Sequence, residues 1–352
     1  MTNENARLIL LRAIFFAAIF SSASGLPCSE AGAQSPEQFY RNKNIDLVIG
    51  YTPGGGYDAY GRTVARHMGK HIRGSPNVVP RNMPGGGSRT AAAHVYSVAA
   101  KDGLTIGLVD QSLVLQQAVD DPTIRFDLKR FNYIGNAASD SNMVALWHTT
   151  GIKTVEDAKK KESIIGSTGP NTTSIIPLTM NRVLGTKFKI IFGYPGANEM
   201  NMAQEAGEIE GQASKPWGSW KATRPNLIKE GKINFIVQVA LKKASDLPDV
   251  PLLIEFATNE NDRNLLKLLS APSTVGRPFF TTPDTLKGRV EALRLGFDAT
   301  MKDPDFLEEA KRQGLDIEPS SGADLEKVVN DILSTPKAVS NRLADIINSL
   351  PK

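Results

Sequence analysis

The sequence predicts an α/β protein built from two lobes, and three observations point to this fold class. Short apolar strands alternate with helical segments along most of the chain, which indicates mainly parallel sheets. Glycine-rich turns join several strands to the helices that follow them. Once an N-terminal export signal is set aside, about 320 of the 352 residues remain, a length that suits two domains better than one core.

The N-terminus has the pattern of a secretory signal peptide over residues 1–33. Arg7 and Arg12 precede a short apolar run at 13–20, and Ala31-Gly32-Ala33 forms a small-x-small cleavage site. The run is shorter than the ~18 residues that a membrane span needs. A retained amphipathic anchor is the alternative. We expect cleavage before Gln34 and a periplasmic protein.

The single cysteine, Cys28, lies before the expected cleavage site. Lipid attachment at Cys28 is disfavoured, because Pro27 stands where lipoprotein signals usually carry a small residue. The mature chain is therefore expected to have neither disulfides nor thiol chemistry. Its net charge stays at +4, since the leader holds two arginines and two glutamates. This mild positive charge would attract small anions but does not indicate a nucleic-acid partner.

Three cycles of strand, loop and helix are expected after the signal. The strands are predicted at 45–50, 77–80 and 105–109, and the helices at 59–72, 89–100 and from 113. The loops between them are 51–58, 84–88 and 110–112. Because ligands of parallel sheets bind at the carboxyl ends of the strands, these three loops are expected at one binding edge.

A second lobe is predicted to interrupt the first. Its expected strands are 163–166, 188–192 and 233–241, with helices at 175–184 and 199–205. The rest is predicted to be mostly helical, at 284–302, 304–313, 321–333 and 336–350. We therefore predict lobe 1 over 34–140 and 245–352, and lobe 2 over 141–244. Two chain crossings would form a hinge around a cleft.

The first glycine loop predicts a binding site for an anion. Gly54, Gly55 and Gly56 expose backbone N–H groups at the start of a helix, where the helix dipole adds partial positive charge. No Cβ prevents a solute oxygen from lying against this loop. Asp58 is expected to cap the helix by accepting from its first-turn amides. A tight turn without a ligand is the alternative.

The loops of the second lobe offer a matching polar surface. Side-chain donors gather before one helix at 168–174, and a second helix start follows the loop 194–198. These groups would also serve as ordinary helix caps. The ligand-binding residues expected from all the loops are Tyr51, Pro53, Gly54, Gly55, Gly56, Tyr57, Asp58, Gln111, Ser112, Thr168, Asn171, Thr172, Ser174, Gly196, Ala197 and Asn198.

One lysine, two tryptophans and two histidines each allow both a functional and a structural interpretation. Lys215 could pair with a distal carboxylate of a solute, but a solvated lysine is the favoured interpretation. Trp217 and Trp220 would either wall the cleft or pack in the core. His67 and His71 share a helical face, yet no third ligand stands nearby, so we expect surface residues rather than a metal site.

Motifs of enzymes are weak in this chain. Gly54-x-Gly56-x-x-Ala59 satisfies the dinucleotide fingerprint, but no acidic residue ends the second predicted strand. No P-loop, G-x-S-x-G, H-E-x-x-H or cysteine nucleophile is present. We therefore expect no catalytic residues, cofactor or metal. An exported α/β enzyme that uses the same cleft is the alternative to a binding protein.

Several motifs resemble one family along nearly the whole mature chain. Tyr-Thr-Pro-Gly-Gly-Gly-Tyr-Asp at 51–58 is followed by Val-Val-Pro-Arg-Asn-Met-Pro-Gly-Gly-Gly at 78–87 and Asp-Gly-Leu-Thr-Ile-Gly at 102–107. Gly-Ser-Thr-Gly at 166–169, Gly-Tyr-Pro-Gly at 193–196, Gly-Glu-Ile-Glu at 207–210 and Leu-Pro-Asp-Val-Pro at 247–251 continue the pattern. The chain resembles the receptors of tripartite tricarboxylate transporters, also called Bug proteins.

The resemblance implies a type II periplasmic binding protein, with two α/β lobes, a hinge and a cleft. Receptors of this family hold a ligand carboxylate through backbone amides of the first loop and close the second lobe over it. The implied partners are a small carboxylate and the two membrane subunits of a secondary transporter, and we expect a monomer. Some relatives feed sensors instead. The segments 170–173, 215–220 and 259–269 depart from the family pattern and bear on which solute fits.

Overall fold

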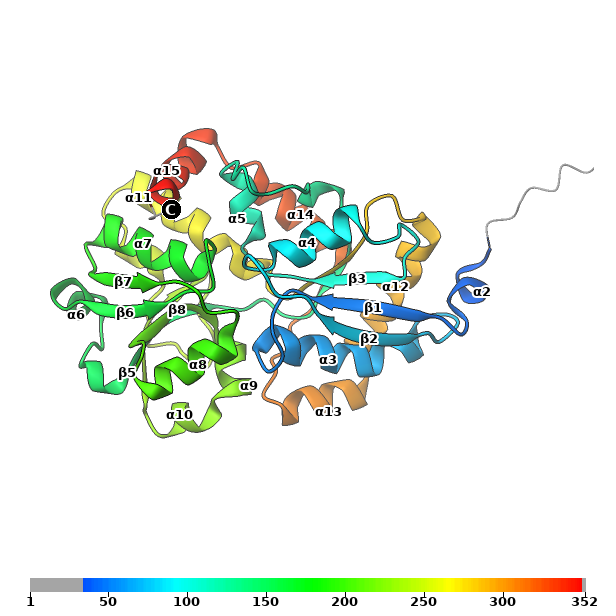
Figure 1. Cartoon of the computed structure of the whole chain (residues 1–352), viewed down its shortest axis with the longest axis horizontal. Helices are drawn as coiled ribbons and strands as arrows, with labels where there is room; N and C mark the ends of the chain where they lie inside the picture. The colour runs from blue at the N-terminus through cyan, green and yellow to red at the C-terminus, as the bar shows by residue number, and fades with distance from the viewer. Residues whose placement is uncertain (1–33, 350–352) are drawn as a thin grey trace, which may run out of the picture. The chain divides into compact units, whose positions relative to one another are not determined.

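The computed structural model describes residues 34–349 and folds them around two β-sheets covered by helices, which confirms the α/β class (Figure 1). The first sheet has the strand order β11-β4-β10-β3-β1-β2. β1 pairs in parallel with β2 and β3, whereas β10 runs antiparallel between β3 and β4. The strands are β1 (Asn44–Ile49), β2 (Asn77–Asn82), β3 (Thr105–Leu108), β4 (Asn132–Asn136), β10 (Pro278–Thr281) and β11 (Ser320–Ser321).

Helices cover both faces of the first sheet, and this explains why β1 ends in the apolar run Leu47-Val48-Ile49. Ile45, Leu47 and Ile49 pack on one face with α3, α12 and α13, while Val48 packs on the other face with α4, α5 and α14. Alternate side chains of a strand point to opposite faces, so a strand covered twice needs a continuous apolar run. The helices are α3 (Gly56–Met68), α4 (Arg89–Ser97), α5 (Leu113–Ala118), α12 (Lys287–Thr300), α13 (Pro304–Arg312) and α14 (Gly322–Leu333).

The second sheet has the strand order β7-β6-β8-β5-β9. β6 pairs in parallel with β7 and β8, and β5 runs antiparallel between β8 and β9. Its strands are β5 (Asn142–Trp147), β6 (Ser163–Gly166), β7 (Phe188–Ile191), β8 (Gly211–Pro216) and β9 (Ile233–Val239), and the helices between them are α6 (Val155–Lys160), α7 (Thr172–Leu184), α8 (Ala197–Ala206), α9 (Trp217–Thr223) and α10 (Pro225–Lys229).

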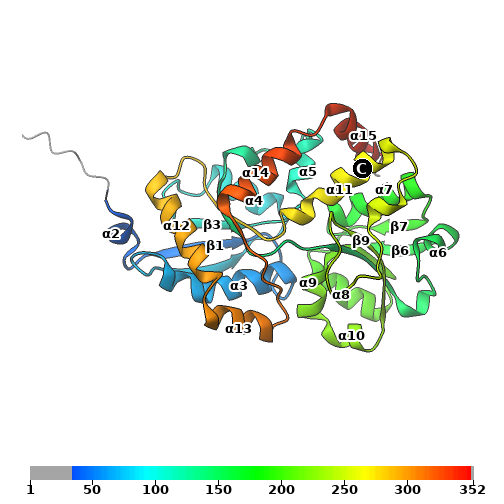
Figure 2. The ribbon, with the colours of Figure 1, turned by 180° about the vertical axis from the view of Figure 1, so that it is seen from behind.

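Two C-terminal helices pack beside the second sheet rather than the first, as Figure 2 shows. They are α11 (Glu260–Ser270) and α15 (Lys337–Asn348). Leu265 and Leu269 of α11 share one buried cluster with Leu343 of α15 and Ile176 of α7. The segment 259–269, which departs from the family pattern in the sequence, therefore contributes to the core. The lobe boundaries at 140, 141, 244 and 245 stay a prediction about which parts move together.

The predicted elements of the strand–loop–helix cycles are present, with ends that differ by a few residues. The main differences are five strands that the sequence analysis did not predict, β4, β5, β8, β10 and β11. The first four of these pair antiparallel to a neighbour and lie inside a sheet, where burial rather than alternation sets their composition. The predicted signal peptide and Cys28 lie outside the described residues. Within residues 34–349, no helix combines the length and apolar character that crossing a membrane requires.

A substitution at Phe297 of α12 would test how the helices pack on the first sheet. Its ring is fully buried, lies 5.3 Å from the ring of Phe279, and occupies the space where a side chain at Gly135 would stand. We predict that Phe297→Ala lowers the free energy of unfolding by about 3–5 kcal/mol in urea titrations. Leu295→Ala is the control on the same helix, because Leu295 is 51% exposed. Equal effects of the two substitutions would contradict this packing.

Candidate functional site

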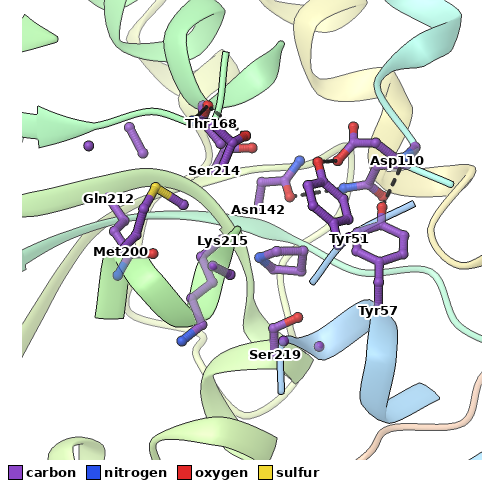
Figure 3. Close-up of a pocket in the computed structure, with 18 residues that line it drawn as sticks. Tyr51, Tyr57, Asp110, Asn142, Thr168, Met200, Gln212, Ser214, Lys215 and Ser219 are labelled. Carbon is purple, nitrogen blue, oxygen red and sulfur yellow. Dashed lines mark hydrogen bonds between the residues drawn. The ribbon is translucent and has the colours of Figure 1, made fainter. Parts of the chain in front are cut away.

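A small cavity lies between the two sheets (Figure 3), with a volume of about 40 Å³. This volume accommodates only a few water molecules, so a larger solute requires the walls to move apart. From the first sheet it is lined by Tyr51, Gly55, Gly56, Tyr57, Asp110 and Gln111. From the second sheet and its helices it is lined by Asn142, Gly166, Thr168, Thr173, Ala197, Met200, Gln212, Ala213, Ser214, Lys215, Pro216 and Ser219.

Strand ends and helix starts bring these residues together. Tyr51 follows β1, Gln111 follows β3, and Gly166 ends β6. β1 and β3 are parallel, so their carboxyl ends meet at one edge, as the sequence analysis predicted. Ala197 begins α8, and the first turn of α3 begins at Gly56. Two helix N-termini therefore reach the cavity, one from each sheet.

The glycine loop leaves backbone donors unpaired at the start of α3. Gly54 has φ +85°, a conformation that favours glycine, and Gly55 is the N-cap residue with no side-chain cap. Among residues 34–349, no acceptor takes the N–H of Gly55 or Gly56. The first amides of a helix have no intrahelical partner and carry partial positive charge. Gly55 and Gly56 also line the cavity, so these donors are placed where a solute can lie.

Asp58 does not cap the helix as predicted. It is the third residue of α3, and its carboxylate accepts from the N–H of Gly54 at 3.0 Å, from Arg62 Nε at 2.9 Å and from Asn82 Nδ2 at 2.8 Å. Burial alone would raise the pKa of Asp58, but these hydrogen bonds outweigh it and the pKa is lowered. The ionised carboxylate of Asp58 therefore fixes the conformation of the loop through these hydrogen bonds. Asp58 does not line the cavity.

A hydrogen-bonded group at the ends of β1 and β3 forms one wall of the cavity (Figure 3). Tyr51 Oη donates to Asp110 Oδ2 at 2.6 Å, and the N–H of Gln111 donates to Tyr57 Oη at 2.9 Å. Gln111 Nε2 donates to Asn142 Oδ1 at 2.9 Å, which joins the two sheets. Burial raises the pKa of Tyr51 and of Tyr57, so both phenols keep their protons.

The polar residues before α7 mostly bond to one another. Asn171 caps α7 by accepting from the N–H of Thr173 at 2.9 Å, and its Nδ2 donates to Thr168 Oγ1 at 2.9 Å. Ser174 Oγ donates to the carbonyl of Gly169 at 2.9 Å. Ser214 Oγ donates to Thr172 Oγ1 at 2.6 Å. Helix capping is thus the observed role of Asn171, and only Thr168 and Thr173 of this loop line the cavity.

Three glycines allow the two sides of the site to touch. A Cβ built at Gly56 would lie 1.8 Å from Ser219 Oγ, and one at Gly87 would lie 2.2 Å from Asn171 Nδ2. A Cβ at Gly196 would lie 2.2 Å from Thr52 Oγ1. At these three positions the missing side chain makes room for the opposite lobe. A Cβ at Gly54 would lie an ordinary 3.7 Å from Asn198, and one at Gly55 would have its nearest atoms 3.9 Å away.

A buried ion pair lies directly behind the cavity wall. Arg277 is fully buried, and its Nη2 donates to Asp140 Oδ2 and to Ser219 Oγ, each at 2.9 Å. Its guanidinium lies 4.4 Å from the ring centre of Tyr57 and 4.8 Å from that of Tyr60. Asp140 belongs to the crossing from β4 to β5, so this pair ties that crossing to both walls of the site.

Of the predicted ligand-binding residues, seven line the cavity and nine do not. Those that line it are Tyr51, Gly55, Gly56, Tyr57, Gln111, Thr168 and Ala197. Those that do not are Pro53, Gly54, Asp58, Ser112, Asn171, Thr172, Ser174, Gly196 and Asn198. Ser112 is held by Asp110, which accepts from its N–H at 2.8 Å and from its hydroxyl. Whether any of these residues contacts a solute stays a prediction.

The residues that the sequence analysis missed come mainly from β8. Gln212, Ala213, Ser214 and Pro216 line the cavity, but β8 lacks the apolar pattern that identifies a strand. Asp110 was also missed, although its position directly before the predicted Gln111 and Ser112 was a usable signal. The other additional lining residues are Asn142, Gly166, Thr173, Met200 and Ser219.

The favoured interpretation of Lys215 as a solvated lysine is wrong. Its side chain is buried among the residues that line the cavity. Trp217 and Trp220 are also buried and pack edge-on against Phe235, so they belong to the core of the second lobe. The reason is that α9 begins immediately after β8, and its first turn folds back over the sheet.

The two helical histidines bond to carboxylates of α13. His67 Nε2 lies 2.6 Å from Glu309 Oε2, and His71 Nε2 lies 2.7 Å from Asp303 Oδ2. These pairs join the C-terminal end of α3 and the turn after it to α13 and its N-cap residue Asp303, and none of the four residues lines the cavity. Among residues 34–349, no three histidine, cysteine or acidic side chains are grouped as metal ligands.

The two α/β lobes have the fold of the second type of periplasmic binding protein, which solved structures also show. BugD matches with a TM-score of 0.69 and 18% identity, covering 88% of this chain and 98% of its own. R. palustris Rpa4515 with adipate matches at 0.68 and 16%, covering 87% and 97%. MatC from Rhodopseudomonas palustris with bound malate matches at 0.65 and 17%, covering 87% and 99%.

The chain belongs to the tripartite tricarboxylate transporter family of receptors, because that family's model matches residues 61–344. The match begins beyond the glycine loop, so membership does not depend on it. A relative from Cupriavidus necator, the "UPF0065 protein in gbd 5'region", is 27% identical over 308 residues, which cover 85% of this chain and 86% of the relative. The resemblance found in the sequence is therefore confirmed.

Because Gly56 lies against Ser219, closure of the cavity should be sensitive to any side chain added at position 56. A methyl group at position 56 would overlap Ser219 Oγ, so Gly56→Ala should hold the walls apart. We predict that this variant folds but loses at least about tenfold in solute affinity, on the order of 1.4 kcal/mol, measured by calorimetry. Adding Ser219→Gly removes the overlapping atoms and should restore most of the loss. A double variant as weak as Gly56→Ala would contradict this explanation.

Proposed function

We propose that this protein is a periplasmic receptor that captures a small carboxylate and delivers it to the membrane subunits of a tripartite tricarboxylate transporter. The observation that carries the proposal is the pair of unpaired amides at Gly55 and Gly56, which line the cavity at the start of α3. Such amides bind anionic oxygens without a cationic side chain. The predicted signal peptide supports the location, and the family supports the partner.

The same geometry makes a carboxylate a better fit than a dinucleotide. The loop amide of Gly54 is already taken by Asp58, and Asn198 lies against Gly54 from the other lobe. A dinucleotide site also calls for an acidic residue that binds the ribose, and β2 ends at Asn82 without one. Two proteins of this fold were solved with adipate and malate, which are small carboxylates. Each carboxylate group of such a solute needs only a few hydrogen-bond donors. An exported enzyme in this cleft is the second candidate, and turnover of a bound solute would favour it.

Delivery to a sensor rather than to a transporter is compatible with the same capture mechanism. Both roles require only that the solute is held between the two walls of the cavity. Uptake measurements in a strain without the two membrane subunits separate them. If uptake of the solute is lost with those subunits, the receptor feeds transport. If uptake persists, the transport part of the proposal is wrong while the binding part stands.

A thermal-shift panel identifies the class of solute. The panel holds mono-, di- and tricarboxylates, aromatic acids and acidic amino acids, with sugars and amines as contrasts. A solute at 100 times its Kd stabilises the folded protein by about 2.7 kcal/mol, so at least one acid should raise the Tm clearly. A response to sugars or amines with silence across all acids would contradict the carboxylate proposal.

Gly55→Val tests the amides directly. The backbone of Gly55, at φ −88° and ψ 172°, is open to valine, and the nearest atoms to a new Cβ are 3.9 Å away. The variant should therefore fold, yet its side chain would cover the amides and weaken acid binding at least about tenfold. Gly288→Val is the matched control, since Gly288 is exposed on α12. Unchanged affinity in folded Gly55→Val would remove this loop from the site.

A further inference from the structure

Lys215 stands out among the residues that line the cavity. It is the only lysine or arginine in the lining, and it is just 3% exposed. It belongs to β8 and lies on the wall opposite Tyr57 and Asp110 (Figure 3). A buried ammonium loses its hydration, so it is costly unless a counter-ion replaces the lost water.

No acidic side chain in residues 34–349 forms an ion pair with Lys215. Its Nζ donates to Asn201 Oδ1 at 2.9 Å and to Thr223 Oγ1 at 3.0 Å, and both acceptors are neutral. Its remaining contact is the face of Trp220, whose ring centre lies 3.8 Å away. By contrast, Arg277, the other fully buried cation at this site, is paired with Asp140. The charge of Lys215 is solvated by dipoles only.

Around Lys215, more buried hydrogen-bond donors than acceptors are left without a partner. Asn201 Nδ2, Gln204 Nε2 and Trp220 Nε1 are buried donors without a partner, against one unpaired acceptor, Gln212 Oε1. The orientation of the Asn201 amide follows from its neighbours, because its Oδ1 accepts from both Lys215 and Gln212. A cluster with excess N–H groups and an unpaired ammonium favours an anion.

The nearby ionisable groups do not supply that anion. Arg224, at the end of α9, and Glu205 of α8 bond to each other. From the first sheet, Asp110 lines the same cavity, but its carboxylate already accepts from Tyr51 and Ser112. Tyr57 faces the cavity from α3 as a neutral phenol. Glu205 raises the pKa of Lys215, but burial and Arg224 outweigh it. None of these carboxylates forms an ion pair with Lys215.

We propose that Lys215 takes its counter-charge from the solute, so that it selects a solute with a second anionic group at the far side from Gly55 and Gly56. This inference rests on the proposed capture of the first carboxylate by the glycine loop. It names the class more narrowly: dicarboxylates are preferred to monocarboxylates of the same chain length, and Lys215 is the residue that distinguishes them.

Proton uptake is the second consequence. Burial lowers the pKa of Lys215 well below its ordinary value, and the charge of Arg224 lowers it further. An anion placed beside the amine favours the ammonium form and raises the pKa again. Between the lower pKa of the empty site and the higher pKa of the occupied site, binding takes up a proton. Dicarboxylate affinity should therefore fall as the pH rises through that interval.

Titration calorimetry tests the proposal with succinate, glutarate and adipate beside butyrate, valerate and hexanoate. Each acid is measured in phosphate and in Tris, whose ionisation heats differ, at several pH values. The wild type should bind at least one dicarboxylate about tenfold or more tightly than its matched monocarboxylate, with a heat that changes between buffers. In Lys215→Met, the preference and the buffer dependence should both disappear, while monocarboxylate affinity changes less than about threefold.

The control is Lys189→Met, an exposed lysine of β7 in the same lobe, which should behave as the wild type. Lys215→Met should also raise the Tm of the solute-free protein, because methionine fills the space without an unpaired charge. A lysine that only ties α8 to α9 would instead lower the Tm when replaced. Equal binding of mono- and dicarboxylates, or a preference that survives in Lys215→Met, overturns this inference alone. Absence of binding by any acid overturns the proposed function with it.

Discussion

Two backbone N–H groups at the start of α3 are the feature on which the site depends. Gly55 and Gly56 have no acceptor for them among residues 34–349, yet they are buried beside a cavity. Buried donors without partners are costly, so an occupant that accepts from them is favoured. β1 places the loop at the edge of the first sheet, and Asp58 holds its shape through Gly54. The fold thus presents backbone rather than side chains to an anion.

The glycines of these loops leave space for two different neighbours, the contents of the cavity and the side chains of the opposite wall. At Gly55 the open space faces the cavity, whereas at Gly56 and Gly87 it is filled by Ser219 and Asn171 of the opposite wall. The sequence analysis assigned every glycine of the first loop to the solute. That assignment could not separate the two uses, because both need the same absence of a Cβ and only the tertiary arrangement shows what lies opposite each glycine.

The sequence was informative where local conformation decides the structure. Glycine and proline loops after apolar strands predicted the fold class and one wall of the cavity, including Tyr51, Tyr57 and Gln111. It was uninformative for β8, which lies in the middle of the second sheet with few apolar side chains because it faces the cavity. Lys215 was misjudged for the same reason: a lysine beside a turn suggests exposure, and only the position of α9 buries it.

The most direct measurement of the central claim is a crystal structure of the protein with its preferred acid. We expect a carboxylate oxygen within hydrogen-bond distance, about 2.7–3.2 Å, of the backbone nitrogens of Gly55 and Gly56. A solute held elsewhere, with these two nitrogens facing only water, would contradict the account of how this receptor captures its ligand.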